Sequence, residues 1–255
     1  MAKFIIAQPY SLTATATSET SSMPASNLDK VQPSDIWRST SLTGQSIAVD
    51  LGSAKAVTAL ALMFTNLTAS ASWRVQAGTT TGVTDYDAGT VTAWAGATQN
   101  TDRPHAFLDL TTSAQTYRYW KITLTDAANP AGYFQAGRLV IASAFQGTRN
   151  YGFGAGRGFK DLSTQKDAFG GQLIVEEKAK RPVVSFEVNW LTATEMEATV
   201  LELQRNMTGA VFAMLDPATS TYRQGRMYYG RLSLEPVIIS AFNVFSTRFT
   251  VEGLI

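Results

Sequence analysis

Apolar and polar residues alternate in short runs through the first half of the chain. The clearest runs are Ile47–Leu51, Trp73–Ala77 and Trp120–Leu124. A period of two places successive side chains on opposite faces of a strand, so each run predicts a half-buried β-strand. Turn-forming residues, as in Asp126–Pro130, separate the runs, and no helical stripe of useful length interrupts them. Residues 1–146 are therefore predicted to form an antiparallel β-sandwich.

The second half combines strands with one helix. Strands are predicted at Val184–Trp190, Val211–Leu215, Arg226–Leu234 and Phe242–Val251. Between the first two, the helix predicted over 193–207 carries an apolar stripe at helical spacing, formed by Met196, Val200, Leu203 and Met207. A capping box starts it, either Thr192 with Glu195 or Thr194 with Glu197. The order strand, helix, strands predicts a small α+β domain over residues 147–255.

Tyr151–Gly158 has glycine at every second position and follows the predicted domain boundary after Gln146. It lacks both the Gly-Lys-Ser/Thr of a P-loop and the G-x-G-x-x-G spacing of a dinucleotide-binding turn. The segment is therefore interpreted as a flexible connector. Residues 1–146 carry nine cations and nine anions, and residues 147–255 carry twelve and eleven. Because neither half is basic, no specific nucleic-acid binding is predicted.

The composition narrows the chemistry further. Charged residues make up 16% of the 255 residues, against the roughly 25% that is typical, and the net charge is +1. There is no cysteine and one histidine, which excludes thiolate chemistry, cysteine-based zinc sites and HExxH zinc sites. No G-x-S-x-G nucleophile elbow and no cofactor motif is present. We therefore expect neither an enzyme nor a bound cofactor. The sequence also lacks a signal-peptide core and an apolar run long enough to span a membrane, so we expect no membrane insertion.

Several residues are candidates for metal-binding, catalytic or sugar-binding sites. The Asp85–Gly89 segment departs from the EF-hand calcium pattern and is better explained as a turn. Glu176 and Glu177 point to opposite faces of a strand, so they cannot flank one glycosidic bond. His105 lies among turn residues and is predicted to be a surface residue. Tyr86 and Trp94 could stack on a sugar ring from loop positions, although hydrophobic anchoring of the loop is the more common role of such an aromatic residue.

Segments of the first half resemble the discoidin-like (coagulation-factor type C) family of galactose-binding-like jelly rolls. The resemblance rests on Ala25–Leu28, Ile36–Ser39, Ile47–Gly52, Trp73–Gln76, Tyr119–Ile122 and Gly137–Val140, in the family's order. It covers roughly residues 20–145 and implies a jelly-roll β-sandwich. The chain lacks the terminal cysteine pair of the secreted members, so the resemblance does not extend to their extracellular roles.

The whole chain is similar to tail proteins of long-tailed bacteriophages, in which a discoidin-like domain precedes a small β-rich domain of the distal-tail or tail-tube type. The similarity rests on Gly137–Ile141, Ala144–Gln146, Asn150–Phe153, Gly170–Leu173, Val184–Trp190, Asp216–Pro217, Tyr229–Leu232 and Ser246–Val251. It implies a structural subunit of the virion tail tip, made in the host bacterial cytoplasm. Its implied partners are the tail-tube protein, the hub or tip proteins and the tape measure, and we expect a homo-oligomeric, hexameric ring.

Two functional hypotheses follow. In the first, the second domain forms the ring and the jelly roll decorates it. Inter-subunit contacts are then expected from the arginines close to its strands, which are Arg223, Arg226, Arg231 and Arg248. In the alternative, the jelly roll is a carbohydrate-binding module or adhesin that recognises a host-surface glycan through Tyr86 and Trp94.

Overall fold

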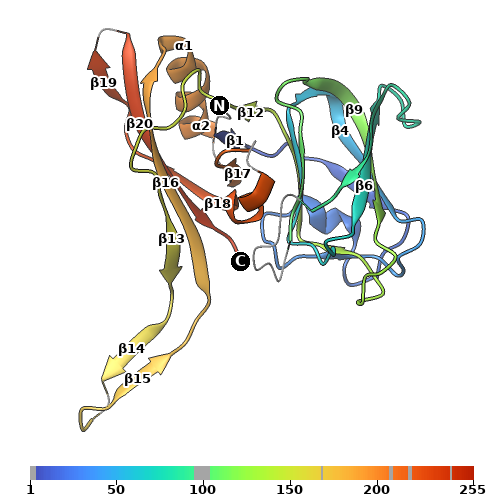
Figure 1. Ribbon diagram of the computed structural model, residues 1–255, viewed down its shortest axis with the longest axis horizontal. Coiled ribbons are helices and arrows are strands. Elements are labelled where there is room, and N and C mark those ends of the chain that lie inside the picture. Colours follow the sequence, from blue (N-terminus) through green and yellow to red (C-terminus); the bar gives the residue numbers. More distant parts are fainter. Residues whose placement is uncertain (1–3, 95–103, 168, 207–208, 218–219, 242) are drawn as a thin grey trace. The chain divides into compact units, whose positions relative to one another are not determined.

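The structure is a computed structural model that describes residues 4–94, 104–167, 169–206, 209–217, 220–241 and 243–255 (Figure 1). The chain divides into two compact units. The first consists of residues 1–146 with 214–227, and the second of residues 147–213 with 228–255. Both are built mainly from antiparallel strands, which confirms the predicted mainly β fold class.

The first unit is a jelly-roll β-sandwich, as predicted. One sheet has the strand order β2-β4-β9-β6-β7 and the other β11-β5-β8, while β10 pairs with β3 and β1 with β12. The strand bounds are β1 Ile5–Ala7, β2 Thr13–Ala16, β3 Trp37–Arg38, β4 Ser46–Val57, β5 Ala59–Met63, β6 Ser72–Gly78, β7 Tyr86–Thr92, β8 Ala106–Asp109, β9 Gln115–Thr125, β10 Gln135–Ala136, β11 Arg138–Ala142 and β12 Ala144–Phe145. A 3₁₀ helix spans Ala25–Asp29.

The sequence alternation explains which face of the five-stranded sheet is buried. In β6, Trp73, Val75 and Ala77 are fully buried, whereas Arg74 is exposed and Gln76 is half-buried. These inward residues pack against the other sheet in one core. The largest fully buried side chains of this core include Trp37, Trp73 and Trp120. Because the inward positions are apolar, the polar residues of the same strands form the outer face.

Residues 214–227 join the first unit through a buried glutamine. Gln224 is 4% exposed and lies in a 3₁₀ turn, Gln224–Arg226, which follows another at Ser220–Tyr222. Its Nε2 donates to the carbonyl of His105 at 2.7 Å, and its Oε1 accepts the His105 N–H at 2.9 Å. One amide side chain thus satisfies both backbone groups of a residue 119 positions away.

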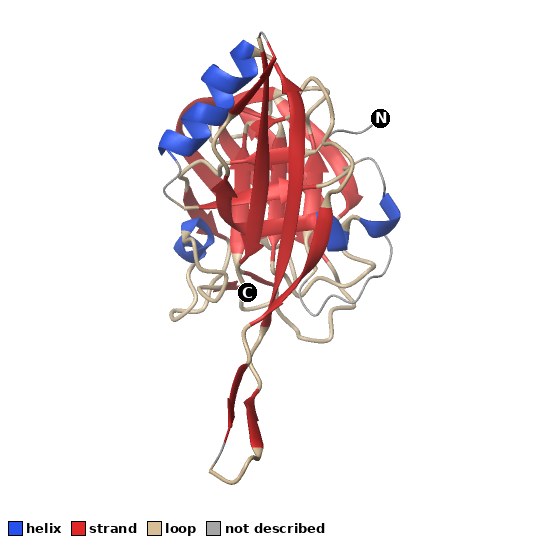
Figure 2. Ribbon diagram, turned by 90° about the vertical axis from the view of Figure 1, so that its left-hand side faces the viewer, coloured by secondary structure: helices blue, strands red, loops and turns tan. Residues whose placement is uncertain are grey.

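The second unit is a sheet of order β17-β18-β20-β16-β13 with β19 paired to β20 (Figures 1 and 2). The strand bounds are β13 Gly156–Asp161, β14 Thr164–Asp167, β15 Leu173–Glu176, β16 Lys180–Leu191, β17 Ala210–Met214, β18 Met227–Leu234, β19 Ile238–Ala241 and β20 Val244–Gly253. The helix runs as α1 Ala193–Glu195, a π-turn Met196–Val200 and α2 Leu201–Asn206. The Thr192–Glu195 capping box starts it.

The apolar stripe of the helix is only partly buried. Met196 is 8% exposed and Val200 is fully buried, while Leu203 is half-buried and Met207 lies outside the described residues. Gln204 donates from its side chain to the Glu235 carbonyl at 3.2 Å, which fixes the helix beside the turn that follows β18.

The interpretation of Tyr151–Gly158 as a flexible connector is wrong for its second half. Gly156 and Gly158 lie in β13, where they pair with Ser185 and Val183 of β16. Glycine can adopt the extended conformation, although at a higher entropic cost than other residues, and the ladder to a strand about 25 positions later supplies the order that local composition cannot predict.

Candidate functional sites

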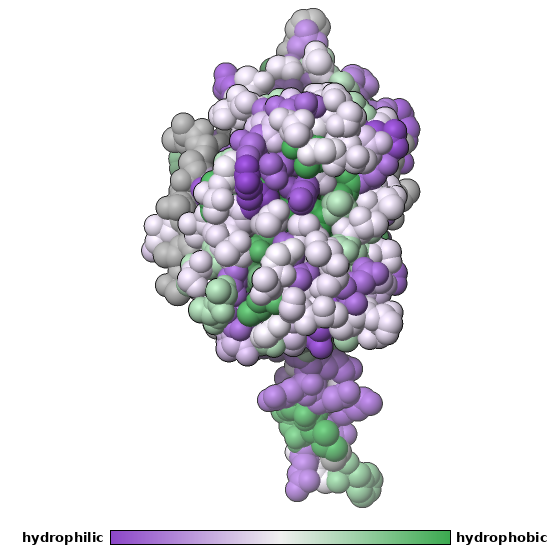
Figure 3. All heavy atoms as spheres, turned by 90° about the vertical axis from the view of Figure 1, so that its right-hand side faces the viewer, coloured by the Kyte–Doolittle hydropathy of each residue, from purple (hydrophilic) through white to green (hydrophobic). Residues whose placement is uncertain are grey.

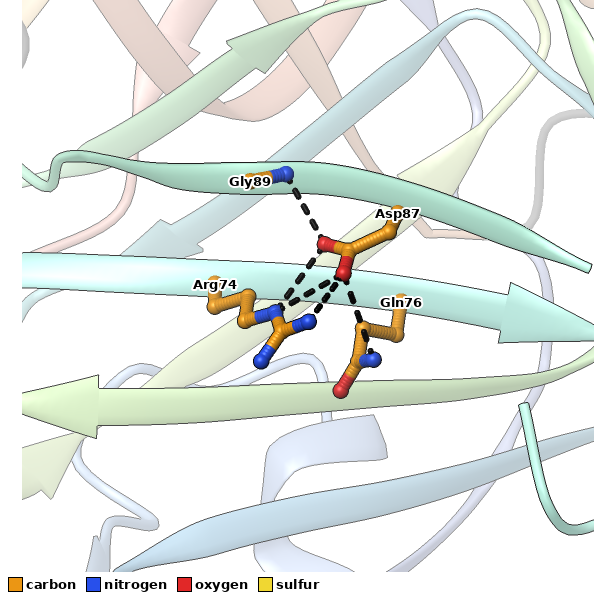
Figure 4. A network of polar contacts seen from close by, with 4 residues as sticks. All are labelled: Arg74, Gln76, Asp87 and Gly89. Carbon is orange, nitrogen blue, oxygen red and sulfur yellow. Dashed lines mark hydrogen bonds and ion pairs between the residues drawn. The ribbon is translucent and has the colours of Figure 1, made fainter. Parts of the chain in front are cut away.

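The outer face of the five-stranded sheet carries an ion-pair network (Figure 4). The Arg74 guanidinium on β6 donates from Nε to both carboxylate oxygens of Asp87 on β7, at 3.1 and 2.9 Å, and a second nitrogen pairs with the same carboxylate. The Gly89 N–H and the Gln76 side chain donate to Asp87 as well, at 2.8 and 3.5 Å. The guanidinium of Arg74 lowers the pKa of Asp87. Because Arg74 lies on β6 and Asp87 on β7, the network joins these two strands.

The Asp85–Gly89 segment uses its two carboxylates separately. Asp85 accepts the backbone N–H and the hydroxyl of Thr79 at 2.7 and 2.8 Å, and these bonds lower its pKa. Asp87 pairs with Arg74 instead. Among the described residues, no group of three or more histidine, cysteine or acidic side chains is placed to hold a metal ion.

A second ion pair on the same face orients an aromatic ring. Arg118 donates to both oxygens of Asp50 at 2.7 and 2.8 Å, and the Gly52 N–H adds a third hydrogen bond to that carboxylate at 2.7 Å. The hydrogen bond from Arg118, followed by that from Gly52, lowers the pKa of Asp50 to about 2. The Arg118 guanidinium lies 4.8 Å from the centre of the Tyr119 ring. The Tyr119 ring is therefore oriented by the Arg118 guanidinium, which Asp50 in turn fixes in place.

Beside this ring the sheet surface is hollowed by about 220 Å³. The strand register explains the shape, because Ala48 faces Thr15 on one side and Lys121 on the other, and Asp50 faces Tyr119. Ala48 has a short side chain between longer ones, so it forms a floor. The β6–β7 loop completes the lining with Thr81 and Val83. The residues that line the hollow also include Thr13, Thr15, Asp50, Tyr119 and Lys121.

The two aromatic residues proposed for glycan contact lie elsewhere in the first unit. Tyr86 begins β7, packs against the core and meets Trp120 at a centroid distance of 6.4 Å; burial raises its pKa. Trp94 forms an isolated bridge with Ala106, and its indole nitrogen is buried without a hydrogen-bond partner among the described residues. The segment after it, residues 95–103, lies outside the described part of the chain.

His105, predicted to be a surface residue, is half-buried, and its ring is engaged by the protein. Its Nδ1 accepts the Phe64 N–H at 3.0 Å, and its ring meets the Phe64 ring edge-on at 5.1 Å. Burial lowers the pKa of the imidazole to about 4. Neighbouring turn residues gave no sign of this, because the contact comes from a residue 41 positions earlier. The imidazole is neutral at pH 7 and serves as a backbone cap.

The four arginines proposed for inter-subunit contact have different surroundings. Arg226 pairs with Asp216 at 2.5 Å, and Arg223 donates to the Pro217 carbonyl at 2.8 and 3.1 Å. Arg248 lies 3.8 Å from both Glu187 and Glu235, with half of its side chain exposed. Arg231 is exposed on β18 and has no side-chain partner among the described residues.

The hairpin β14–β15 exposes apolar side chains that no part of the described chain covers. With its flanking residues it forms an arm, residues 162–179, that extends beyond β13 and β16 (Figure 2). Leu173, Ile174 and Val175 are 57%, 57% and 47% exposed, and Phe169 at the turn is fully exposed. Figure 3 shows a band of hydrophobic side chains on this projecting hairpin. Sequence reasoning missed the arm, since a run such as Leu173–Val175 usually marks a buried strand.

The arm is held together by its backbone ladder and a few polar contacts. Thr164 and Glu176 bond at 2.9 Å across the hairpin, and the Lys178 N–H donates to the Ser163 hydroxyl at 3.0 Å. Leu173 and Val175 point to one face of β15 and Ile174 to the other, so both faces are apolar. An isolated two-stranded hairpin is marginally stable in water, and an exposed apolar strand invites association.

Comparisons with known proteins give structural neighbours only. No family model and no curated protein matches the chain. The solved structures that match include the family 32 carbohydrate-binding module of Clostridium perfringens NanJ in complex with galactose, at 19% identity and TM-score 0.44, over 55% of this chain and 99% of that one. Chitosan-binding module 1 of a Paenibacillus chitosanase/glucanase gives 21% and 0.38, over 53% and 99%. A Streptococcus pneumoniae fucose-binding module gives 9% and 0.39, over 53% and 98%.

No helix in the described part of the chain is both long enough and apolar enough to cross a membrane.

Proposed function

We propose that the protein is a structural subunit of a multi-subunit ring and that the arm supplies one of the contacts between subunits. The observation that carries the proposal is the apolar hairpin, whose both faces are exposed over Leu173–Val175. Covering an aliphatic side chain of this kind stabilises by about 1.5–3 kcal/mol when the burial is complete. A closed ring provides such a cover for every copy, because head-to-tail contacts repeat around it.

The identity of the ring follows the sequence resemblance to long-tailed phage tail proteins. On this proposal the subunit belongs to the virion tail tip as a homo-oligomeric, hexameric ring. Its partners would be the tail-tube protein, the hub or tip proteins and the tape measure. The exposed guanidinium group of Arg231 is a candidate for a further contact with a neighbouring copy, whereas Arg223, Arg226 and Arg248 already have partners within the chain.

Shortening the arm tests the proposal. Asp161 and Lys180 face each other in the β13–β16 ladder, so residues 162–179 can be replaced by Asn-Gly, which closes a two-residue hairpin. In sedimentation experiments at about 10 µM, where contacts with a Kd near 1 µM form, the full chain should be a discrete oligomer and the shortened chain a monomer. Thermal unfolding checks that the shortened chain is folded. A monomeric full chain, or an oligomer that survives the replacement, would overturn the proposal.

A second candidate function is carbohydrate binding by the first unit, and the hollow beside Tyr119 favours it. Sugar rings present an apolar face and a rim of hydroxyl groups, so they fit an aromatic ring bordered by polar side chains. The hollow combines the Tyr119 ring with the hydroxyls of Thr13, Thr15 and Thr81. Its volume lies below the roughly 300–1,000 Å³ of pockets for drug-sized ligands, which limits the ligand to about one ring. Titration with methyl glucoside, followed by the shifts of backbone amide signals near the hollow, tests this function.

A further inference from the structure

The charges around the hollow differ in whether they are already paired. Asp50 receives two hydrogen bonds from Arg118 and one from Gly52, so its negative charge is compensated inside the protein. The Lys121 ammonium has no ion pair or hydrogen bond to any described residue. It lies on β9 between Ala48 and Gln76, neither of which carries a charge. The hollow therefore has one uncompensated positive charge on its rim.

The ring and the ammonium come from the same strand in a fixed arrangement. Tyr119 and Lys121 are two residues apart on β9, so both side chains leave the same face of the sheet. Their Cα atoms are separated by about 6.5 Å along the strand. Because Arg118 and Asp50 hold the ring, its position beside the ammonium is set before any ligand arrives. A planar apolar surface and a free cation are thus about one sugar ring apart.

We infer that the hollow binds a single sugar ring that carries a carboxylate, with the ring stacked on Tyr119 and the carboxylate paired with Lys121. This inference rests on the second candidate function and deepens it. The hydroxyls of Thr13 and Thr15 on β2 and of Thr81 in the loop face the hydroxyl groups of the sugar. Asp50 cannot repel the carboxylate strongly, because its own charge is paired with Arg118.

Two ligands that differ only in the acid group provide the experiment. Methyl β-glucuronide and methyl β-glucoside are titrated into the full chain, at up to about 10 mM, and the Kd is followed by the shifts of backbone amide signals. The glucuronide should bind at least about threefold more tightly at low salt, and the difference should shrink as the salt concentration rises. Signals from β4 and β9 near the hollow should shift.

Four variants separate the roles of the two side chains. Lys121→Met should remove the preference for the acid, and Lys55→Met, a cation in β4 outside the hollow, should preserve it. Tyr119→Leu should weaken both ligands by about tenfold or more, whereas Tyr119→Phe should leave both nearly unchanged.

The outcomes distinguish the inference from the function beneath it. Equal affinity for the two ligands, with no effect of Lys121→Met, would overturn the inference that the ligand is an acidic sugar. The proposal of carbohydrate binding would then remain. Absence of shifts near the hollow with either ligand would overturn both. Neither result bears on the ring proposal, which depends on the arm in the second unit.

Discussion

His105 makes the stability of the first unit sensitive to acid. The pKa of its imidazole is about 4 in the folded chain, because burial disfavours the charged form, against about 6.5 in an unfolded chain. Between these values the unfolded chain binds a proton that the folded chain does not. Stability is therefore fully present above about pH 6.5 and is lost as the pH falls towards 4. The difference between these two pKa values corresponds to about 3 kcal/mol in total.

The variant His105→Asn isolates this effect. An asparagine oxygen can accept the Phe64 N–H that Nδ1 accepts in the native chain, but it does not titrate in this range. Carboxylates titrate equally in both proteins, so their contribution cancels in the comparison. Between pH 7 and pH 4.5 the native chain should lose about 2–3 kcal/mol more unfolding free energy than the variant, measured by urea denaturation.

The chain contains one histidine, so its pKa can also be measured without assignment, from the carbon-bound protons of the imidazole in NMR spectra. A folded-state pKa near 6.5, together with parallel pH profiles for the native chain and the variant, would refute the argument. Such a result would mean that the imidazole is hydrated in solution.

Three further changes have expected effects. Gln224→Ala leaves the backbone N–H and carbonyl of His105 without partners, so we expect a loss of about 1–3 kcal/mol in urea unfolding and faster amide exchange at His105. Gly230→Ala places a Cβ 1.9 Å from the Glu252 carbonyl oxygen, so the variant should fail to accumulate as folded protein, whereas Gly158→Ala, which meets open space, should fold. Leu173, Ile174 and Val175 are about half exposed, and covering them by a neighbouring subunit should stabilise the contact by about 3 kcal/mol. Replacing all three by serine should therefore weaken association in sedimentation experiments by about 100-fold or more.

Local patterns predicted the strands of the sandwich well. Trp73–Ala77 alternates in sequence and lies in β6 with its apolar residues in the core. The helix start was also visible, since the Thr192–Glu195 capping box depends on residues three positions apart. These features share one property: the residues that decide them are close in sequence.

Features that depend on distant partners could not be predicted. The glycines of β13 become a strand because β16 pairs with them, and the half-buried His105 ring is held by Phe64, 41 positions earlier. The hollow needs Ala48 beside Lys121, a register between strands 73 positions apart. The arm illustrates the reverse case, since its apolar run predicts burial and only the placement of the hairpin reveals exposure.

Cross-linking from the arm tests the central claim most directly. The chain has no cysteine, so Ile174→Cys provides a unique attachment point for a thiol-reactive photo-crosslinker on the arm. Thr90→Cys, on an exposed position of β7 in the first unit, provides the control. With equal amounts of isotopically light and heavy chains, illumination of the Ile174→Cys protein should join light to heavy chains, with the attached peptides belonging to another copy, while the control should give far less. Cross-links confined within single chains, in both variants, would contradict the account.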